Sequence, residues 1–443
     1  MQKSSEFIDW LKQQESEGKI ESEGRFTISQ DKAWDKLAAF QLPFPEAWVI
    51  KLVQAGVAHP QAGINVQQTR EETSFLFINV PDWTRGSVEQ AVHSPRPDDR
   101  RDLAHLAVAL RALFQIQDQP FSIRYPDGQH VGWNGNEFLD LQGNETLPKV
   151  ESLVVRVAHF PVGESRSIFN LGNSDAAQKR ASISLALTEH CHYSPQTVTL
   201  DRRPLNGYLF DSVFGMTDKS SPLAAFQIPA HPALQTLELE ASDQLFTTDF
   251  GTHQVSLATA IQENSLTEQG SGVCLISLFF RKRLVRSDIG VIEPVYRRSQ
   301  FIWIADGVVV QREPMPIKTA IGVGIALSAD GLETDLTGLQ PRESEEKLAR
   351  KLAAFEIAKN QLLELEKSLH GQGVEVTHTL QSPLKKGLLG AFLCVVFPIV
   401  GIGYLTRLGF RYKNSNEKMR ELDQVYDREL ANLCLEFSRL ELS

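Results

Sequence analysis

The sequence predicts an α+β protein built from two mixed domains and a helical C-terminal unit. In the first third of the chain, helical patterns stand between short strands with alternating apolar residues, such as 63–68 and 74–80. From about residue 151 the apolar segments become longer and strand-like. Near the C-terminus, two helices with leucine spacing flank the segment Gly387–Thr406, which contains no charged residue.

The composition is that of a globular protein, with 42% hydrophobic residues, 23% charged residues and a formal net charge of −10. This balance disfavours general nucleic-acid binding, because phosphate neutralisation requires basic surface, so we expect no nucleic-acid partner. The four cysteines are far apart and form no CxxC pair, which predicts neither a disulfide framework nor a zinc site. The N-terminus is polar and lacks an apolar signal core, so we expect the bulk of the chain to be cytoplasmic.

A leader helix and a polar spacer are predicted over 1–30, followed by a first α/β domain over 31–148. Its first helix starts near Pro45, at a position that suits proline, and ends before Pro60. The two strands named above follow this helix.

The remainder of the first domain is predicted as a loop, a helix and a hairpin. Residues 84–101 are rich in Arg, Pro and Asp and are interpreted as a loop. Leucines at helical spacing then predict a helix over about 103–113, and Pro126-Asp127-Gly128 predicts the turn of a hairpin.

The second domain is predicted over 149–338 and is rich in strands. It contains a helix near 174–191 and a hairpin that turns on Asp306-Gly307. The segment 338–342 is interpreted as a domain boundary.

A helical C-terminal unit is predicted over 343–443, with amphipathic helices at 344–369 and 416–441. These two helices either pair as an antiparallel coiled coil, which would also offer a surface for a homo-oligomer, or pack separately on the body of the protein.

The apolar run Gly387–Thr406 between these helices has three interpretations: a single membrane span, a re-entrant hairpin, or a helix buried in protein or in an oligomer interface. Pro398 divides the run into halves of about ten residues, each roughly 15 Å long as a helix. Basic residues follow and precede the run, which favours keeping both ends on the cytoplasmic side. We therefore expect membrane association, with the hairpin favoured over the other two.

The order of elements over 43–145 resembles the N-terminal half of the GHKL ATPase superfamily, which includes gyrase, histidine kinases and the ninety-kilodalton heat-shock chaperones. The resemblance covers about 100 residues and depends on the helix KLVQAGVA, the two strands and the helix HLAVALRALF. The following strand-rich region bears a weaker resemblance to the transducer domain of gyrase-type members. The resemblance implies a nucleotide-binding α/β sandwich.

The residues that would serve this site are altered. The resemblance implies a water-positioning Glu, a magnesium-binding Asn and an Asp on the first helix, and these positions hold Lys51, Ala55 and Ala58. An Asp followed by glycines should read adenine, but the sequence has Asn79 and an offset Asp82 without the glycine pair. A glycine-rich phosphate lid should fall within 84–101, where Gly86 is the one glycine. We therefore expect a pseudo-ATPase with no cofactor, while Asn79, Asp82 and Glu46 remain candidates for an active enzyme with diverged ligands.

Other candidate chemistry is sparse. The cluster 189–193, Glu-His-Cys-His-Tyr, offers too few ligands on one face for zinc and is interpreted as a helix C-terminus, so no metal site is expected. Arginines and lysines at 281–286 and 297–298 form a local basic group, interpreted mainly as solvated strand ends, with contact to an anionic membrane surface or to an acidic partner as the alternatives.

The sequence thus predicts a non-catalytic scaffold or interaction protein at the cytoplasmic face of a membrane, with a protein partner. The alternatives are an active ATPase or chaperone-like protein, and a soluble oligomer subunit that uses the apolar run as an interface.

Overall fold

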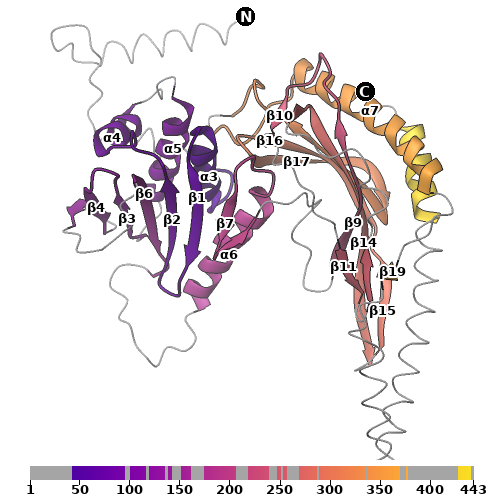
Figure 1. Cartoon of the computed structure of the whole chain (residues 1–443), viewed down its shortest axis with the longest axis horizontal. Coiled ribbons are helices and arrows are strands. Elements are labelled where there is room, and N and C mark those ends of the chain that lie inside the picture. The colour runs from indigo at the N-terminus through magenta and orange to yellow at the C-terminus, as the bar shows by residue number, and fades with distance from the viewer. Residues whose placement is uncertain are drawn as a thin grey trace, which may run out of the picture. The chain divides into compact units, whose positions relative to one another are not determined.

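A computed structural model gives the structure of the protein (Figure 1). It describes residues 42–94, 100–115, 119–134, 138–141, 151–160, 174–205, 218–238, 247–250, 253–256, 269–286, 289–335, 337–369, 376–377 and 428–440. The leader predicted over 1–30 and the apolar run Gly387–Thr406 lie outside these residues.

The described chain mixes helices and sheets, which confirms the α+β class. Its labelled helices are α3 (Ala47–Ala58), α4 (Arg85–His93), α5 (Arg101–Gln115), α6 (Ser174–His190) and α7 (Glu345–Leu369). A further helix spans 428–439. No helix of the described residues is both long enough and apolar enough to cross a membrane.

The first sheet has eight strands in the order β5-β4-β3-β6-β2-β1-β7-β8. Its strands are β1 (Gly63–Gln68), β2 (Glu72–Ile78), β3 (Phe121–Arg124), β4 (His130–Trp133), β5 (Phe138–Asp140), β6 (Ser152–Ala158), β7 (Val198–Leu200) and β8 (Arg203–Pro204). Only β1 and β7 pair in parallel among these neighbours. The predicted domain division at 148/149 falls inside this sheet, because β6, β7 and β8 come after it in the chain.

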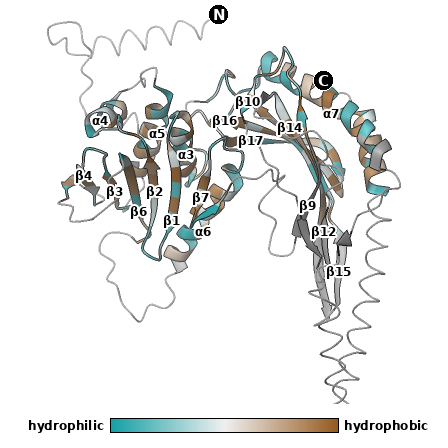
Figure 2. Cartoon of the chain, in the orientation of Figure 1, coloured by the Kyte–Doolittle hydropathy of each residue, from teal (hydrophilic) through white to brown (hydrophobic). Residues whose placement is uncertain are grey.

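Helix α3 lies against this sheet and determines where the candidate site is. Ile64 and Phe77 alternate with less buried residues along β1 and β2, as a half-buried strand requires (Figure 2). A Cβ atom on Gly56 of α3 would lie 2.6 Å from Ile64 Cδ1, so this glycine allows the helix and strand to approach closely. Helix α3 also contacts α5, α6 and β17.

The second sheet has six strands: β15, β14, β18, β16 and β17 in order, with β9 paired to β14. Its strands are β9 (Asp218–Ile228), β14 (Gly272–Arg286), β15 (Ile289–Pro294), β16 (Arg297–Ala305), β17 (Val308–Thr319) and β18 (Ile321–Ser328). Ala305 pairs with Val308, and Asp306 and Gly307 between them both have positive φ, which confirms the predicted two-residue hairpin turn.

Short strands complete the described structure. They are β10 (Leu237–Glu238), β11 (Thr247–Phe250), β12 (His253–Ser256), β13 (Gln269–Gly270) and β19 (Val376–Thr377). β10 pairs with β13, and β11, β12 and β19 form a three-stranded sheet.

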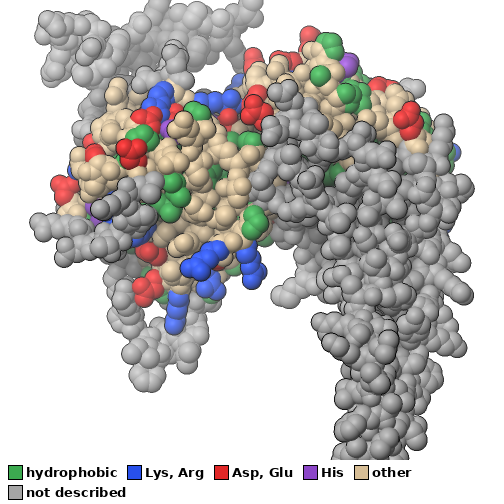
Figure 3. All heavy atoms as spheres, in the orientation of Figure 1, with side chains coloured by type: hydrophobic (Ala, Val, Ile, Leu, Met, Phe, Trp, Pro, Cys, Tyr) green, Lys and Arg blue, Asp and Glu red, His purple; other side chains and the backbone are tan. Residues whose placement is uncertain are grey.

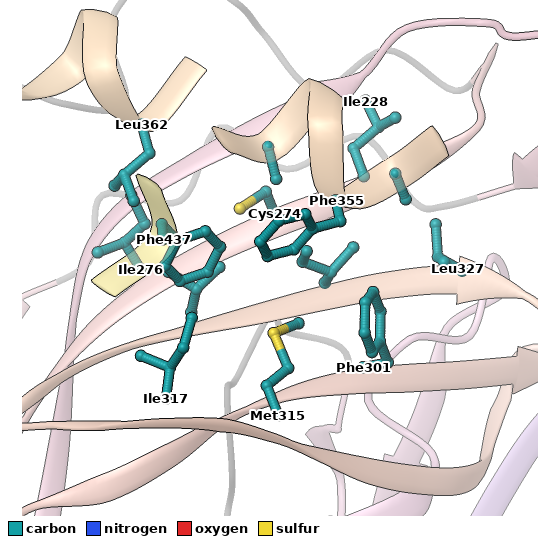
Figure 4. Close-up of a cluster of buried hydrophobic side chains, with 14 of the residues drawn as sticks. Ile228, Cys274, Ile276, Phe301, Met315, Ile317, Leu327, Phe355, Leu362 and Phe437 are labelled. Carbon is teal, nitrogen blue, oxygen red and sulfur yellow. The ribbon is translucent and has the colours of Figure 1, made fainter. Parts of the chain in front are cut away.

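One face of the second sheet is covered by α7 together with helix 428–439 (Figure 4). The rings of Phe355 and Phe437 stack with centroids 5.2 Å apart, and Cys434 Sγ lies 4.0 Å from the Leu362 carbonyl oxygen. Phe355 of α7 contacts Phe437, whereas Leu362, further along α7, contacts Cys434, which comes earlier in the second helix. The two helices are therefore antiparallel. Both contribute to the same hydrophobic core as the sheet, while a coiled coil between them stays a prediction.

The segment 84–101, interpreted as a loop, is in part helical, and this expectation was wrong. The Thr84 side chain accepts a hydrogen bond from the Ser87 backbone N–H and caps α4, and Arg101 already begins α5. Three apolar side chains, Val88, Ala91 and Val92, bury one face of this mostly polar helix.

Candidate functional site

Lys51 lies in the middle of α3 with 1% of its surface exposed. Its Nζ atom is 3.4 Å from Nδ1 of His105, which lies on α5. Burial lowers the pKa of the Lys51 ammonium from 10.5 to about 8, although the negative charges of Asp306 and Asp335 act in the opposite direction. The group therefore remains mainly charged at neutral pH, inside the protein.

His105 connects Lys51 to the hairpin of the second sheet. Its Nε2 atom lies 2.7 Å from Oδ2 of Asp306, in the turn between β16 and β17. Burial is the largest influence on the His105 pKa and lowers it, against the opposing hydrogen bond to Asp306. A neutral imidazole that donates from Nε2 to Asp306 and accepts at Nδ1 from Lys51 satisfies both contacts.

Asp306 and Asp330 balance a second cation, Arg101. Arg101 Nε lies 3.0 Å from Asp306 Oδ2, and its NH2 atom lies 2.6 Å from Asp330 Oδ1. Asp306 is almost fully buried, with 9% of its side chain exposed, whereas half of Arg101 is exposed. The four groups Lys51, His105, Asp306 and Arg101 thus form one continuous charged cluster, which we call the Lys51 cluster.

A tight loop between β18 and α7 closes over Lys51. Asp335 Oδ1 accepts hydrogen bonds from the backbone N–H groups of Leu339 and Gln340, and Thr334 forms a bridge with Pro341. Gly338 has a φ of 65°, and a Cβ atom there would lie 3.2 Å from Lys51 Nζ. The segment 338–342, interpreted as a domain boundary, is therefore part of this closed loop.

The hairpin turn is also fixed from its other side. A Cβ atom on Gly307 would lie 2.8 Å from Pro195 Cδ and 3.1 Å from Val57 Cγ1, so glycine is needed by space as well as by its φ of 70°. Gln54 of α3 donates to the Ala305 carbonyl oxygen at 3.0 Å. The face of α3 that carries Lys51 is thus in contact with the second sheet's hairpin.

The other predicted positions on α3 carry no chemistry. Ala55 is fully buried and Ala58 is partly buried. Neither methyl group can ligate a metal ion. Glu46 precedes the helix at its N-cap without a side-chain capping bond, and its charge acts on Lys179 of α6.

Asn79 and Asp82 lie at the end of β2, in a different environment. Asn79 is exposed with a φ of 62°. Asp82 Oδ1 lies 3.1 Å from His59 Nε2, and its other oxygen lies 2.6 Å from Arg100 NH1. Burial acts to raise the Asp82 pKa, but the hydrogen bond from His59 and the charge of Arg100 outweigh it, and the pKa is lowered.

A group of three metal-capable side chains occurs at this place among the described residues. The ligand atoms of His59, Asp82 and Asp102 lie within 4.8 Å of one another. Arg100 pairs with both carboxylates, and Trp83 donates its indole N–H to Asp102 at 2.8 Å. Each carboxylate thus already contacts Arg100 and a second partner, His59 for Asp82 and Trp83 for Asp102, so the group is satisfied within the protein.

The cluster 189–193 lies at the C-terminal end of α6, as predicted. His190 Nδ1 donates to the Val309 carbonyl oxygen, and burial lowers the His190 pKa to about 4. His192 Nδ1 lies 3.1 Å from the Thr188 carbonyl oxygen. Burial raises the pKa of the Cys191 thiol, which makes it a poor nucleophile.

Comparisons with known proteins give little more. No family model matches the sequence, and no curated protein matches it. Among solved structures, the N-terminal domain of a DNA repair protein is similar at 8% identity and a TM-score of 0.33, over 76% of this chain and 99% of that chain. A similarity at this level supports no conclusion about family or function.

Sequence reasoning singled out Lys51 but missed its partners. His105 lay within a helix identified by its leucines, and Asp306 was identified only as a turn residue. Arg101 was assigned to a loop. The one available signal was a lysine on a mostly apolar helix, because a buried ammonium requires partners from elsewhere in the chain.

Proposed function

We propose that the protein is a non-catalytic interaction protein, built on a degenerate nucleotide-binding fold and held at the cytoplasmic face of a membrane. The Lys51 cluster is the observation that supports the absence of catalysis. Where the GHKL resemblance implies a water-positioning Glu, a buried ammonium donates to His105 and faces the loop at Gly338. A protonated amine cannot accept a proton from water, so this position lacks a general base.

The neighbouring groups do not replace that base. Both ring nitrogens of His105 are engaged, one by Lys51 and the other by Asp306. Ala55 and Ala58 offer no oxygen to magnesium. The cluster instead joins α3 and α5 to the hairpin of the second sheet, which is a structural role.

Calorimetric titration of the full chain with Mg-ATP and Mg-ADP tests this half of the proposal. We expect no saturable heat at millimolar nucleotide and no hydrolysis above the protein-free rate. Saturable, magnesium-dependent binding together with hydrolysis above the protein-free rate, both abolished by Asp82→Ala or Asn79→Ala, would instead establish the alternative of an active ATPase with diverged ligands. Asp140→Ala, at an exposed ion pair on β5, provides the control.

The membrane part of the proposal depends on the uncharged run Gly387–Thr406, and the contacts on either side of this run limit how it could enter a bilayer. Phe355 and Leu362 precede the run, Cys434 and Phe437 follow it, and these residues pack together in one core. A single span would place the two sides of this core on opposite sides of a membrane. The run Gly387–Thr406 must therefore return to its side of entry if it enters a bilayer, which favours the re-entrant hairpin.

A further inference from the structure

Five cationic side chains gather at one end of the first sheet. Figure 3 shows Lys and Arg side chains grouped over α6 and the adjacent strand ends. Three local elements supply them: the turn between β1 and β2, the first half of α6, and the turn and strand at β8. The members are Arg70, Lys179, Arg180, Arg202 and Arg203, which we call the basic surface.

Gln68 holds these three elements together. Its backbone N–H donates to Asp201 Oδ1 at 2.8 Å, in the turn that carries Arg202. Its side-chain amide donates to the Arg180 carbonyl oxygen at 3.2 Å, and its Oε1 accepts from Ser184 at 2.6 Å. The cations therefore belong to one fixed surface, although they come from distant parts of the sequence.

His159 links Arg70 to the same surface. Its Nδ1 atom lies 3.2 Å from the Arg70 carbonyl oxygen, and its Nε2 atom lies 2.8 Å from Thr73 Oγ1. Burial is the largest cause that lowers the His159 pKa, and the positive charges of Lys179 and Arg180 lower it further, while the hydrogen bond to Arg70 and the charge of Glu72 act in the opposite direction. These charges thus act at a site beside the Arg70 turn.

The cations of this surface differ from other arginines of the protein in their ion pairs with carboxylates. Arg85, Arg100 and Arg101 each form ion pairs with two carboxylates. Within the described parts of the chain, no carboxylate forms an ion pair with any of the five residues of the basic surface. The three elements that supply these five cations also contain three acids, Glu71, Asp175 and Asp201, so the surface has a modest excess of positive charge on a protein with a net charge of −10.

Arg202 adds an observation of a different kind. The two residues of the turn between β7 and β8, Asp201 and Arg202, have φ angles of 50° and 68°. Such turns favour glycine at the second position, because a side chain there is strained. An arginine that occupies a strained, exposed position points to a role for its charge.

We propose that the basic surface docks against an anionic membrane through lipid phosphate and carboxylate headgroups. The proposal rests on the membrane-associated function proposed above. Clusters of Lys and Arg are attracted to anionic leaflets, and one hydrophobic insertion combined with a basic patch produces stable attachment. Leu185, further along α6, is a large apolar side chain that is 41% exposed. The apolar run Gly387–Thr406 favours a lipid surface over a nucleic acid as the anionic partner, because a nucleic acid offers no hydrocarbon to an uncharged segment.

Sedimentation of the full chain with phosphatidylcholine vesicles, with and without phosphatidylserine, tests the proposal. We expect the wild type to bind the anionic vesicles more tightly, and this preference to weaken at high salt. The triple variant Arg70→Gln, Arg180→Gln, Arg202→Gly should bind them about tenfold or more weakly. Arg202→Gly relieves the strained φ, and a thermal melt of the variant checks its folding.

Two matched variants sharpen the comparison. Lys318→Gln, Arg342→Gln, Arg439→Gln removes three charges from exposed positions elsewhere and should bind like the wild type. Arg70→Lys, Arg180→Lys, Arg202→Lys keeps the charge and should also retain binding.

Three results would overturn the proposal, and they separate it from the proposed function. If the variant Arg70→Gln, Arg180→Gln, Arg202→Gly binds anionic vesicles like the wild type, the basic surface is not the docking surface, although membrane association stands. If the triple variant loses affinity only for a duplex oligonucleotide, the surface recognises nucleic acid. If no form of the chain binds any vesicle, the membrane-associated function fails together with the inference.

Discussion

Lys51 illustrates what a sequence indicates at the scale of one residue. Its position in the sequence showed that the glutamate implied by the resemblance is absent. It did not show which side chains contact the lysine. His105 is 54 positions away along the chain, and Asp306 reaches His105 from a hairpin 201 positions further on. Such partners depend on the tertiary fold, so no local pattern could identify them.

The pH dependence of stability tests the burial of Lys51. Its pKa is about 8 in the folded protein and 10.5 as the ordinary value, so the unfolded chain binds more protons between these values. Charging the buried amine therefore opposes folding below pH 8, by about 3 kcal/mol, and this cost disappears as the pH rises towards 10.5.

Urea unfolding from pH 7 to 10.5 measures this effect against the variant Lys51→Met. The free energy of unfolding of the wild type should rise, relative to the variant, by about 3 kcal/mol over the window. Lys318→Met, at an exposed position, is the matched substitution. Parallel curves for the wild type and Lys51→Met would mean that Lys51 is solvated.

Secondary-structure elements with strong local patterns were predicted well. The structure confirms helices near the predicted positions of α3, α5, α6 and α7, where apolar spacing and proline or glycine punctuation act within a few residues. Helix α4 was missed because its sequence is mostly polar, although Thr84 followed by Ser87 offered a capping signal. The order of strands in the sheets could not be predicted, since β3–β6 and β1–β7 pair segments far apart in sequence.

Helix 428–439 provides a prediction at the scale of elements. Phe437 is fully buried and stacks on Phe355 of α7, so Phe437→Ala should lower the free energy of unfolding by about 3–5 kcal/mol. Leu435, on the same helix, is 45% exposed, and Leu435→Ala should change it by about 0.5 kcal/mol or less. Chemical denaturation followed by circular dichroism measures both. Equal effects of the two substitutions would show that this helix does not belong to the core.

At the scale of the whole molecule, the described core and the apolar run constrain each other. The sequence identified Gly387–Thr406 as uncharged but left its topology open. The antiparallel contact between α7 and helix 428–439 places residues from before and after the run in one folded body. The sequence left open whether these two helices contact each other or pack separately on the body of the protein. Amphipathic patterns alone do not identify the partner of a helix.

Cell fractionation tests the membrane attachment most directly. The full chain should be compared with a variant in which a Gly/Ser linker of equal length replaces Gly387–Thr406, so that α7 and helix 428–439 are both kept. We expect the full chain to pellet with membranes, to resist carbonate and to be released by detergent, while the variant stays in the supernatant. Epitope tags at both ends should be accessible from the same side. A full chain that remains in the supernatant without detergent would contradict the account and would favour a soluble assembly subunit.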